Sequence, residues 1–344
     1  MKKLTKIGLT ALCGSLAAVT SANAGEMSVS GGATATWSSN SSTVTGNPIG
    51  INSGMTFVGS GELDNGTTFK LSITHADKAA YSVGSISMTM PSMGSISINQ
   101  ATGGAGIGGY DDKMPSAWEE TWGTSLGTSI DLAKGVGSSM NIQYKTPSFA
   151  GTTLAVAYSP KNDGVKNNDK GASAAGGSSH LGAGYDIMLD STISGQNIFL
   201  GYSTTERSGA NKAAGTNADP NDDVEEAVAG IILNIGPLKV GAQATAEWEG
   251  ENQVEANAAG YRNVAYGAAF NVNDDLSISY GRMESKKGYV SGDTATVVME
   301  IDSYQVAYTM GGATIKIAET ESTNNAYSAG TTREATTVAL SLAF

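Results

Sequence analysis

Apolar and polar residues alternate along most of this chain, in segments of about ten residues. The last segment, residues 337–344, places Val338, Leu340 and Leu342 on one face and small or polar residues on the other, and it ends on Phe344. Successive side chains of a β-strand point to opposite faces, so this period indicates strands. The chain offers no helices to cover these apolar faces. The pattern therefore predicts an all-β fold, a transmembrane barrel whose apolar face meets lipid.

The connections between these segments alternate between tight and long. Tight turns are expected near residues 64–66, 91–94, 147–151, 190–195, 236–237, 271–275 and 311–312. Longer connections are expected near residues 39–52, 159–178, 203–223, 248–260, 284–295 and 320–332. The tight turns then gather at one rim and the long loops at the other. The segments number about sixteen, an even count that brings both termini to the tight-turn rim, where the last strand can pair with the first and leave no free edge.

One long segment, residues 100–137, breaks the alternation. It contains glycines, then acidic residues and the aromatic side chains of Trp118 and Trp122. A connection far longer than about 12–15 residues is either functional or disordered. The two tryptophans favour an ordered loop. A solvated acidic surface loop remains the alternative interpretation.

The N-terminus predicts export. Residues 1–24 combine an early basic stretch, an apolar stretch from Ile7 to Val19 that is too short to span a bilayer, and a small-residue cleavage site at Ala22-Asn23-Ala24. This is the pattern of a secretory signal peptide. We expect cleavage after Ala24 and a single mature domain, residues 25–344, exported through the periplasm.

Composition narrows the possible partners. Loss of the three signal-peptide lysines changes the formal net charge from −12 to −15. Nucleic acid is an unsuitable partner for so acidic a chain, whereas cations are natural ones. The single cysteine, Cys13, lies in the signal segment. Disulfides, cysteine-ligated metals and a cysteine nucleophile are therefore excluded from the mature chain.

Four motifs together resemble the general porins of Gram-negative bacteria. The hairpin at residues 141–151 is similar to the one that follows the constriction loop of these porins, and residues 61–67 are similar to an early glycine-acid-asparagine-glycine turn. Residues 93–98 resemble the short strand before that loop. The terminal Phe344 resembles the assembly signal of the family. Each motif is weak alone, but together they cover the mature chain in order.

The resemblance implies a sixteen-stranded, usually trimeric outer-membrane barrel that lets small hydrophilic solutes and ions diffuse through a water-filled channel. Its third external loop, here residues 100–137, would fold into the lumen and place acidic residues at the narrowest point: Asp111, Asp112, Glu119, Glu120 and Asp131. Strand parity would place five further charged residues of the pore on the inner wall: Glu62, Lys70, Lys145, Lys239 and Lys316.

This wall departs from the family pattern, which usually has an arginine cluster there. Isolated lysines lack the guanidinium fork. A strong transverse field across the pore is therefore not expected. Glu62 and the loop carboxylates raise the local concentration of cations over anions, so we expect a mild cation preference. The resemblance also implies contacts with outer-membrane lipid and lipopolysaccharide, and with the barrel-assembly machinery through the last strand. No cofactor is expected.

Three other features carry weaker hypotheses. A structural calcium ion could bind the oxygen-rich segment formed by Asp219, Asp222, Asp223 and Glu225, although the spacing of a defined calcium loop is missing. The only histidines, His75 and His180, have no nucleophile motif beside them, so a barrel hydrolase is a poor alternative. A surface adhesin or surface-layer β-protein would share the acidity, but it would normally show repeats. Outward tyrosines and Trp37 are simplest to explain as interfacial girdles.

Overall fold

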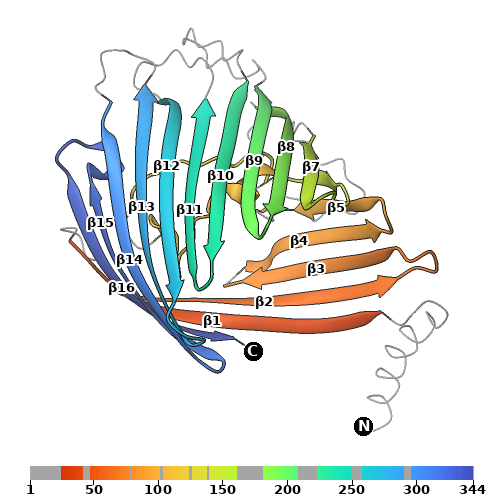
Figure 1. The fold of residues 1–344 in the computed structure, drawn as a ribbon, viewed down its shortest axis with the longest axis horizontal. Coiled ribbons are helices and arrows are strands. Elements are labelled where there is room, and N and C mark those ends of the chain that lie inside the picture. The colour runs from red at the N-terminus through yellow and green to blue at the C-terminus, as the bar shows by residue number, and fades with distance from the viewer. Residues whose placement is uncertain are drawn as a thin grey trace.

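The chain forms one closed barrel of antiparallel strands (Figure 1). The computed structural model describes residues 25–41, 47–77, 79–100, 104–123, 126–137, 139–160, 181–207, 223–248, 258–289 and 296–343. Strands β1 to β16 follow one another around the ring in sequence order. The predicted all-β class and strand number are confirmed.

The strands are 5–15 residues long. The first eight are β1 (Glu26–Asn40), β2 (Ile49–Glu62), β3 (Thr68–Ala76), β4 (Ala79–Met90), β5 (Gly94–Gln100), β6 (Asn141–Lys145), β7 (Thr152–Ser159) and β8 (Leu181–Ile193). The others are β9 (Gln196–Arg207), β10 (Val224–Ile235), β11 (Leu238–Trp248), β12 (Ala258–Asn271), β13 (Leu276–Tyr289), β14 (Val298–Met310), β15 (Ala313–Thr323) and β16 (Thr332–Ala343). In the described part of the chain, two short 3₁₀ helices lie in loops: η1 (Gly106–Tyr110) and η3 (Asn325–Tyr327). Among the described residues no helix is long and apolar enough to cross a membrane.

The barrel closes between its first and last strands. Residues of β1 pair with β16 from Gly32 opposite Ala343 to Asn40 opposite Ala335. A side chain at Gly32 would place its Cβ atom 2.8 Å from the carbonyl oxygen of Leu342, so glycine permits this close approach. In Figure 1 the red β1 and the blue β16 meet at this seam. The predicted pairing of the two terminal strands is therefore confirmed, and it leaves the sheet without free edges.

The two faces of the wall differ in chemistry. Large apolar side chains such as Ile86 and Ile98 are 53% and 48% exposed on the outer face, whereas Asn99, the next residue on β5, is only 7% exposed. The same alternation continues around the ring. Outward tyrosines form pairs, with ring centroids 5.2 Å apart for Tyr158 and Tyr185. An apolar outer face is the arrangement that a lipid environment requires.

Some strands extend beyond their predicted ends, at both rims of the barrel. The second strand starts at Ile49 rather than near Met55, and β8 continues through Asp190 to Ile193, so the turn expected at 190–195 is reduced to Ser194 and Gly195. The connection from β3 to β4 is also tight, because only Asp77 and residue 78 separate the strands. Residues 49–54 and 190–193 are rich in glycine and in polar residues, which strands and loops share.

An ion-pair cluster lies on the outer face near the long-loop ends of β13 and β14. Arg282 contacts Glu284, Glu300 and Asp302, at 2.8 Å for Glu300 and 3.0 Å for Asp302. The hydroxyl of Tyr280 donates a hydrogen bond to Asp302. The predicted signal peptide, residues 1–24, and the terminal Phe344 lie outside the described residues.

Candidate functional site

The long segment between β5 and β6 lies against the inner face of the wall. In Figure 1 this yellow segment passes behind β9 to β12, within the ring of strands. Its backbone N–H groups donate hydrogen bonds to inward side chains: Lys113 to Gln243 (3.2 Å), Ala117 to Ser279 (2.8 Å), and both Trp118 and Glu119 to Gln305 (3.0 Å). The segment thus follows the wall from β11 to β14.

Two buried carboxylates hold the two ends of this segment. Asp186 of β8 accepts hydrogen bonds from the N–H groups of Ile107, at 2.8 Å, and Val136, at 3.1 Å. Glu226 of β10 accepts one N–H on each carboxylate oxygen, from Lys134 and Gly135, both at 2.7 Å. Asp186 is 3% and Glu226 6% exposed. Buried carboxylates need such donors, so each pair satisfies both the acid and the loop backbone.

Apolar contacts also hold the segment against the inner wall. Leu126 and Leu132 belong to one buried cluster with Met283, Met299 and Ile301 of the wall. At the other end Ile107 packs with Phe199 and Val228. The part of the inner wall that the segment covers therefore combines buried apolar side chains with the polar groups that bind the segment backbone. Gly281 permits the close approach, because a Cβ atom there would collide with the hydroxyl of Thr121.

The segment brings four of the five predicted loop acids into one cluster. Asp111 and Glu120 both interact with Asp112, and Glu120 also interacts with Glu119. We call these four residues the acid cluster. Asp131 does not belong to it, because its carboxylate pairs with Lys134 and its backbone carbonyl accepts a hydrogen bond from Asn263 at 2.7 Å.

Two members of the acid cluster, Asp111 and Glu120, titrate near neutral pH. Burial, followed by the charge of Asp112, raises the pKa of Asp111 to about 7. Burial, together with hydrogen bonds to Asp112 and Glu119, raises the pKa of Glu120 to about 7. Neighbouring carboxylates share protons and titrate as a group, so the cluster carries less than its full formal charge at neutral pH.

Lowering the pH from about 8 to about 6 is expected to reduce the preference of the barrel for cations over anions. Each acid with a pKa of about 7 is mainly ionised at the higher pH and mainly protonated at the lower one, so Asp111 and Glu120 together lose most of two negative charges. Lysines keep their charge over this range. Reversal potentials in a salt gradient, measured in planar bilayers, test this. The D111N/E120Q variant should lack the pH step, and a flat wild-type profile would contradict the assignment.

The predicted wall residues face inward but do not gather on one wall. Lys70 lies near Glu62 at the tight-turn ends of β2 and β3, and Lys145 is exposed at the end of β6. The ammonium of Lys316 on β15 lies 5.8 Å from the ring centre of Trp118. Lys239 lies on β11, beside the loop. The lysines are therefore spread around the ring rather than forming a basic wall.

Instead, the inner face of β1 to β5 is lined by hydroxyl and carboxamide groups. Some of them pair across strands, as in Thr56 with Thr74 and Thr34 with Ser341, both at 2.9 Å. The charged inward residues of these strands, Glu26, Glu62 and Lys70, lie at their tight-turn ends. The register places the following uncharged residues on this face: Ser28, Ser30, Thr34, Thr36, Ser38, Asn52, Thr56, Ser60, Thr68, Ser72, Thr74, Ser85, Ser87, Thr89, Ser95, Ser97 and Asn99.

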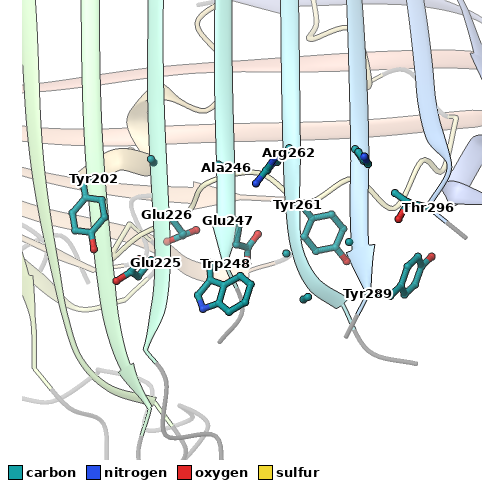
Figure 2. Close-up of a pocket in the computed structure, with 15 residues that line it drawn as sticks. Tyr202, Glu225, Glu226, Ala246, Glu247, Trp248, Tyr261, Arg262, Tyr289 and Thr296 are labelled. Atoms are coloured by element: carbon teal, nitrogen blue, oxygen red, sulfur yellow. The ribbon is translucent and has the colours of Figure 1, made fainter. Parts of the chain in front are cut away.

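A hollow with a volume of about 480 Å³ lies at the long-loop ends of β9 to β13. Figure 2 shows Tyr202, Glu225 and Trp248 along its edge, on neighbouring strands. Its lining residues come from both faces of the wall, and it shares none with the acid cluster. It is a feature of the rim rather than of the passage.

The weaker hypotheses gain no support here. Of the calcium candidates, Asp219 and Asp222 lie outside the described residues, and Asp223 and Glu225 belong to no metal-binding group among the described ones. His75 faces outward, with its ring 6.2 Å from that of Phe57. His180 also lies outside the described residues.

Sequence reasoning missed the wall residues that hold the loop. These wall residues are Asp186, Glu226, Gln243 and Gln305. Each lies away from the tight turn on its strand and points inward, whereas the residues directly before and after it point outward. A carboxylate or carboxamide that strand parity places on the inner face, away from the turns, is the sequence feature that could have indicated a loop-binding residue. Parity alone would have found these residues, but not their partners.

The fold and this inner segment define a class: a closed barrel with an apolar outer face that carries a long loop against its inner wall, the architecture of outer-membrane channels. The chain belongs to the Gram-negative porin family, whose model matches residues 8–344. It is therefore an outer-membrane porin, and the resemblance drawn from its motifs is confirmed.

Solved structures agree with this assignment at the level of the fold. OmpF from Salmonella typhi, solved in complex with daunomycin, is similar with a TM-score of 0.69 at 15% identity, over 92% of this chain and 97% of that one. An anion-selective porin from Comamonas acidovorans gives 0.66 at 11% identity, over 93% and 100%. The trimer form of OmpT from Vibrio cholerae gives 0.63 at 11%, over 93% and 99%. Among curated proteins, none matches the sequence.

Proposed function

We propose that this porin is a mildly cation-selective diffusion channel in which the loop of residues 100–137 narrows the water-filled lumen. The observation that carries the proposal is the seat of this segment: it is held at both ends by Asp186 and Glu226 and follows the inner wall to β14 and beyond. A fixed obstacle inside a barrel sets the cross-section through which solutes diffuse. Family membership favours this function over the adhesin and hydrolase alternatives.

The charges near this passage support a cation preference. The acid cluster is carried by the loop, while the strands β1 to β5 contribute hydroxyl groups along most of their length. Carboxylates raise the local concentration of cations. Hydroxyl groups can replace part of the hydration shell of cations and of anions alike. The acid cluster is only partly ionised at neutral pH, so the cation preference is mild. The similar anion-selective porin shows that this fold does not itself decide the sign.

We further propose that the protein is exported through the periplasm after cleavage at Ala24, that it assembles as a homotrimer, and that its outer face contacts lipopolysaccharide. The last strand, which closes the barrel on β1, would present the terminal Phe344 to the assembly machinery. The exposed apolar side chains of the outer face support either lipid contact or subunit contact.

Protein purified from outer-membrane fractions and inserted into a planar bilayer is expected to give conductance steps in groups of three and a reversal potential of cationic sign. Groups of three follow from three lumens that insert together. Single steps would contradict the trimer, and an anionic reversal potential would contradict the selectivity. A folded, heat-modifiable barrel without conductance would contradict the channel itself.

A further inference from the structure

A second pocket lies on the inner face, between the loop and the tight-turn ends of β9 to β12. Its volume is about 250 Å³. Its polar lining consists of Lys113 and Ser116 from the loop and Asn197, Asn234, Lys239 and Asn271 from the wall. The parity of each strand points these wall residues inward. Both charged groups of the lining are therefore cationic, in a protein whose net charge is strongly negative.

The two lysines reach the pocket from different elements that are tied together. The backbone N–H of Lys113 donates a hydrogen bond to Gln243 at 3.2 Å, and Gln243 donates one to the carbonyl of Asp111 at 2.6 Å. Gln243 lies on the same face of β11 as Lys239. The ammonium of Lys113 also lies 5.7 Å from the ring centre of Tyr110, which stacks on Phe199. These contacts hold Lys113 over the strand that carries Lys239.

The acids around the pocket leave it a cationic character. Asp111 interacts with Lys113, and Asp190 interacts with Tyr110, but neither acid lines the pocket. None of the salt bridges that the structure describes involves Lys239. An anionic solute would therefore compete with fewer acidic side chains for the ammonium of Lys239 than for that of Lys113.

The carboxamides are held in fixed positions. Asn234 donates a hydrogen bond from Nδ2 to the carbonyl of Gly195 at 2.6 Å, and its N–H donates to Gln196 at 2.6 Å. Asn197 donates from Nδ2 to the hydroxyl of Thr192 at 3.0 Å. The Nδ2 of Asn234 also donates to Oδ1 of Asn197 at 3.4 Å, so these two carboxamides are partly paired with each other. A carboxamide nitrogen carries two hydrogens and its oxygen accepts, so Asn197 Nδ2, Asn234 Oδ1 and the carboxamide of Asn271 provide donors and acceptors beside the two ammonium groups. Carboxylate and hydroxyl groups are the complementary set.

We propose that this pocket, which we name the Lys113–Lys239 pocket, binds the carboxylate of small hydroxylated organic anions on their way through the channel. The inference rests on the proposed function and adds a solute class to it. Two ammonium groups can form charge-assisted hydrogen bonds to one carboxylate, and the carboxamides can pair with neighbouring hydroxyl groups. The acid cluster repels anions, whereas this pocket, on the tight-turn side of the loop, would bind them. A neutral polyol would lack the charged contact and pass without it.

Gluconate and sorbitol test the pocket, because they share a six-carbon hydroxylated chain and differ in the carboxylate. Gluconate added to one side of a planar bilayer is expected to reduce the potassium current through the open wild-type channel, and sorbitol at equal concentration to reduce it much less. In K113Q/K239Q the half-blocking gluconate concentration should rise about tenfold, equivalent to about 1.4 kcal/mol. K239Q alone should show part of this rise with the loop untouched.

The matched control is K70Q/K145Q, which removes two inward lysines from strands outside the pocket. It should leave the gluconate block unchanged. Equal block by gluconate and sorbitol in the wild type, or the same loss of block in both double variants, would overturn the proposal. Saturation-transfer NMR of gluconate with detergent-solubilised protein tests the same site without conductance, so a failure of the channel function and a failure of the pocket give different results.

Discussion

Replacing Asp186 and Glu226 together by alanine is expected to raise the single-channel conductance of this porin by a factor of about two and to admit larger solutes, since the narrowest cross-section limits diffusion. Four backbone N–H groups at the two ends of the inner segment lose their acceptors in this variant. Hydrogen bonds to charged groups contribute about 1.5–3 kcal/mol each, so the ends of the segment lose most of what holds them. Planar-bilayer conductance and liposome swelling with sugars of increasing size measure the result.

The control for this variant is Glu225→Ala, which removes the same type of side chain from the neighbouring position of β10. Glu225 points to the outer face, whereas Glu226 points inward. It should leave conductance and size limit unchanged. The barrel itself should persist in both variants, because the strand pairing does not use these side chains, and heat-modifiable migration on gels verifies this. An unchanged conductance in a folded D186A/E226A barrel would show that the segment does not limit the passage.

Neutralising the acid cluster is expected to remove the cation preference. In D111N/D112N/E119Q/E120Q the loop keeps nearly the same volume and loses its charge. The cation-to-anion permeability ratio should fall by a factor of about three or more at 0.1 M salt, where the Debye length is about 10 Å, and by less at 1 M, where it is about 3 Å. Reversal potentials at the two salt concentrations provide the measurement. The conductance should change less than the selectivity, because the cross-section is preserved.

A second quadruple variant separates local charge from net charge. D274N/D275N/E319Q/E321Q removes four acids from the tight turn after β12 and from the outer face of β15. Its formal net charge equals that of the acid-cluster variant, but its loop is intact. The selectivity should stay at the wild-type value. If both quadruple variants lose the cation preference equally, the acid cluster has no special role, and the net charge of the protein would explain the selectivity.

The architecture of this porin was accessible from its sequence because the barrel repeats one local rule. Each strand needs only an apolar residue at every second position, and each tight turn needs residues such as Asp64-Asn65-Gly66. Even the seam between β1 and β16 follows from an even strand number. Parity also placed Lys70, Lys145, Lys239 and Lys316 on the inner face without any knowledge of the structure.

The site was less accessible because its contacts join distant parts of the chain. Asp186 meets Ile107 across 79 residues, and Gln305 meets Trp118 across 187. No local pattern encodes such a pairing. The separation of Asp131 from the acid cluster has the same origin, since it depends on where Asn263 and Lys134 place that part of the loop. The strand ends were missed for another reason: small polar residues fit both a strand and a loop.

The far end of the inner segment has a consequence for biogenesis. The carbonyl oxygen of Leu126 accepts hydrogen bonds from Asn325 and Arg333, which lie 199 and 207 residues further along the chain. These partners come from the last loop and the last strand, so Leu126 can reach this position only after the C-terminal part of the barrel has formed. Contacts of such long sequence separation carry a high entropic cost and form late. The docking of Leu126 therefore marks the final stage of maturation, and the protease resistance of this segment would report when a nascent barrel has become a finished one.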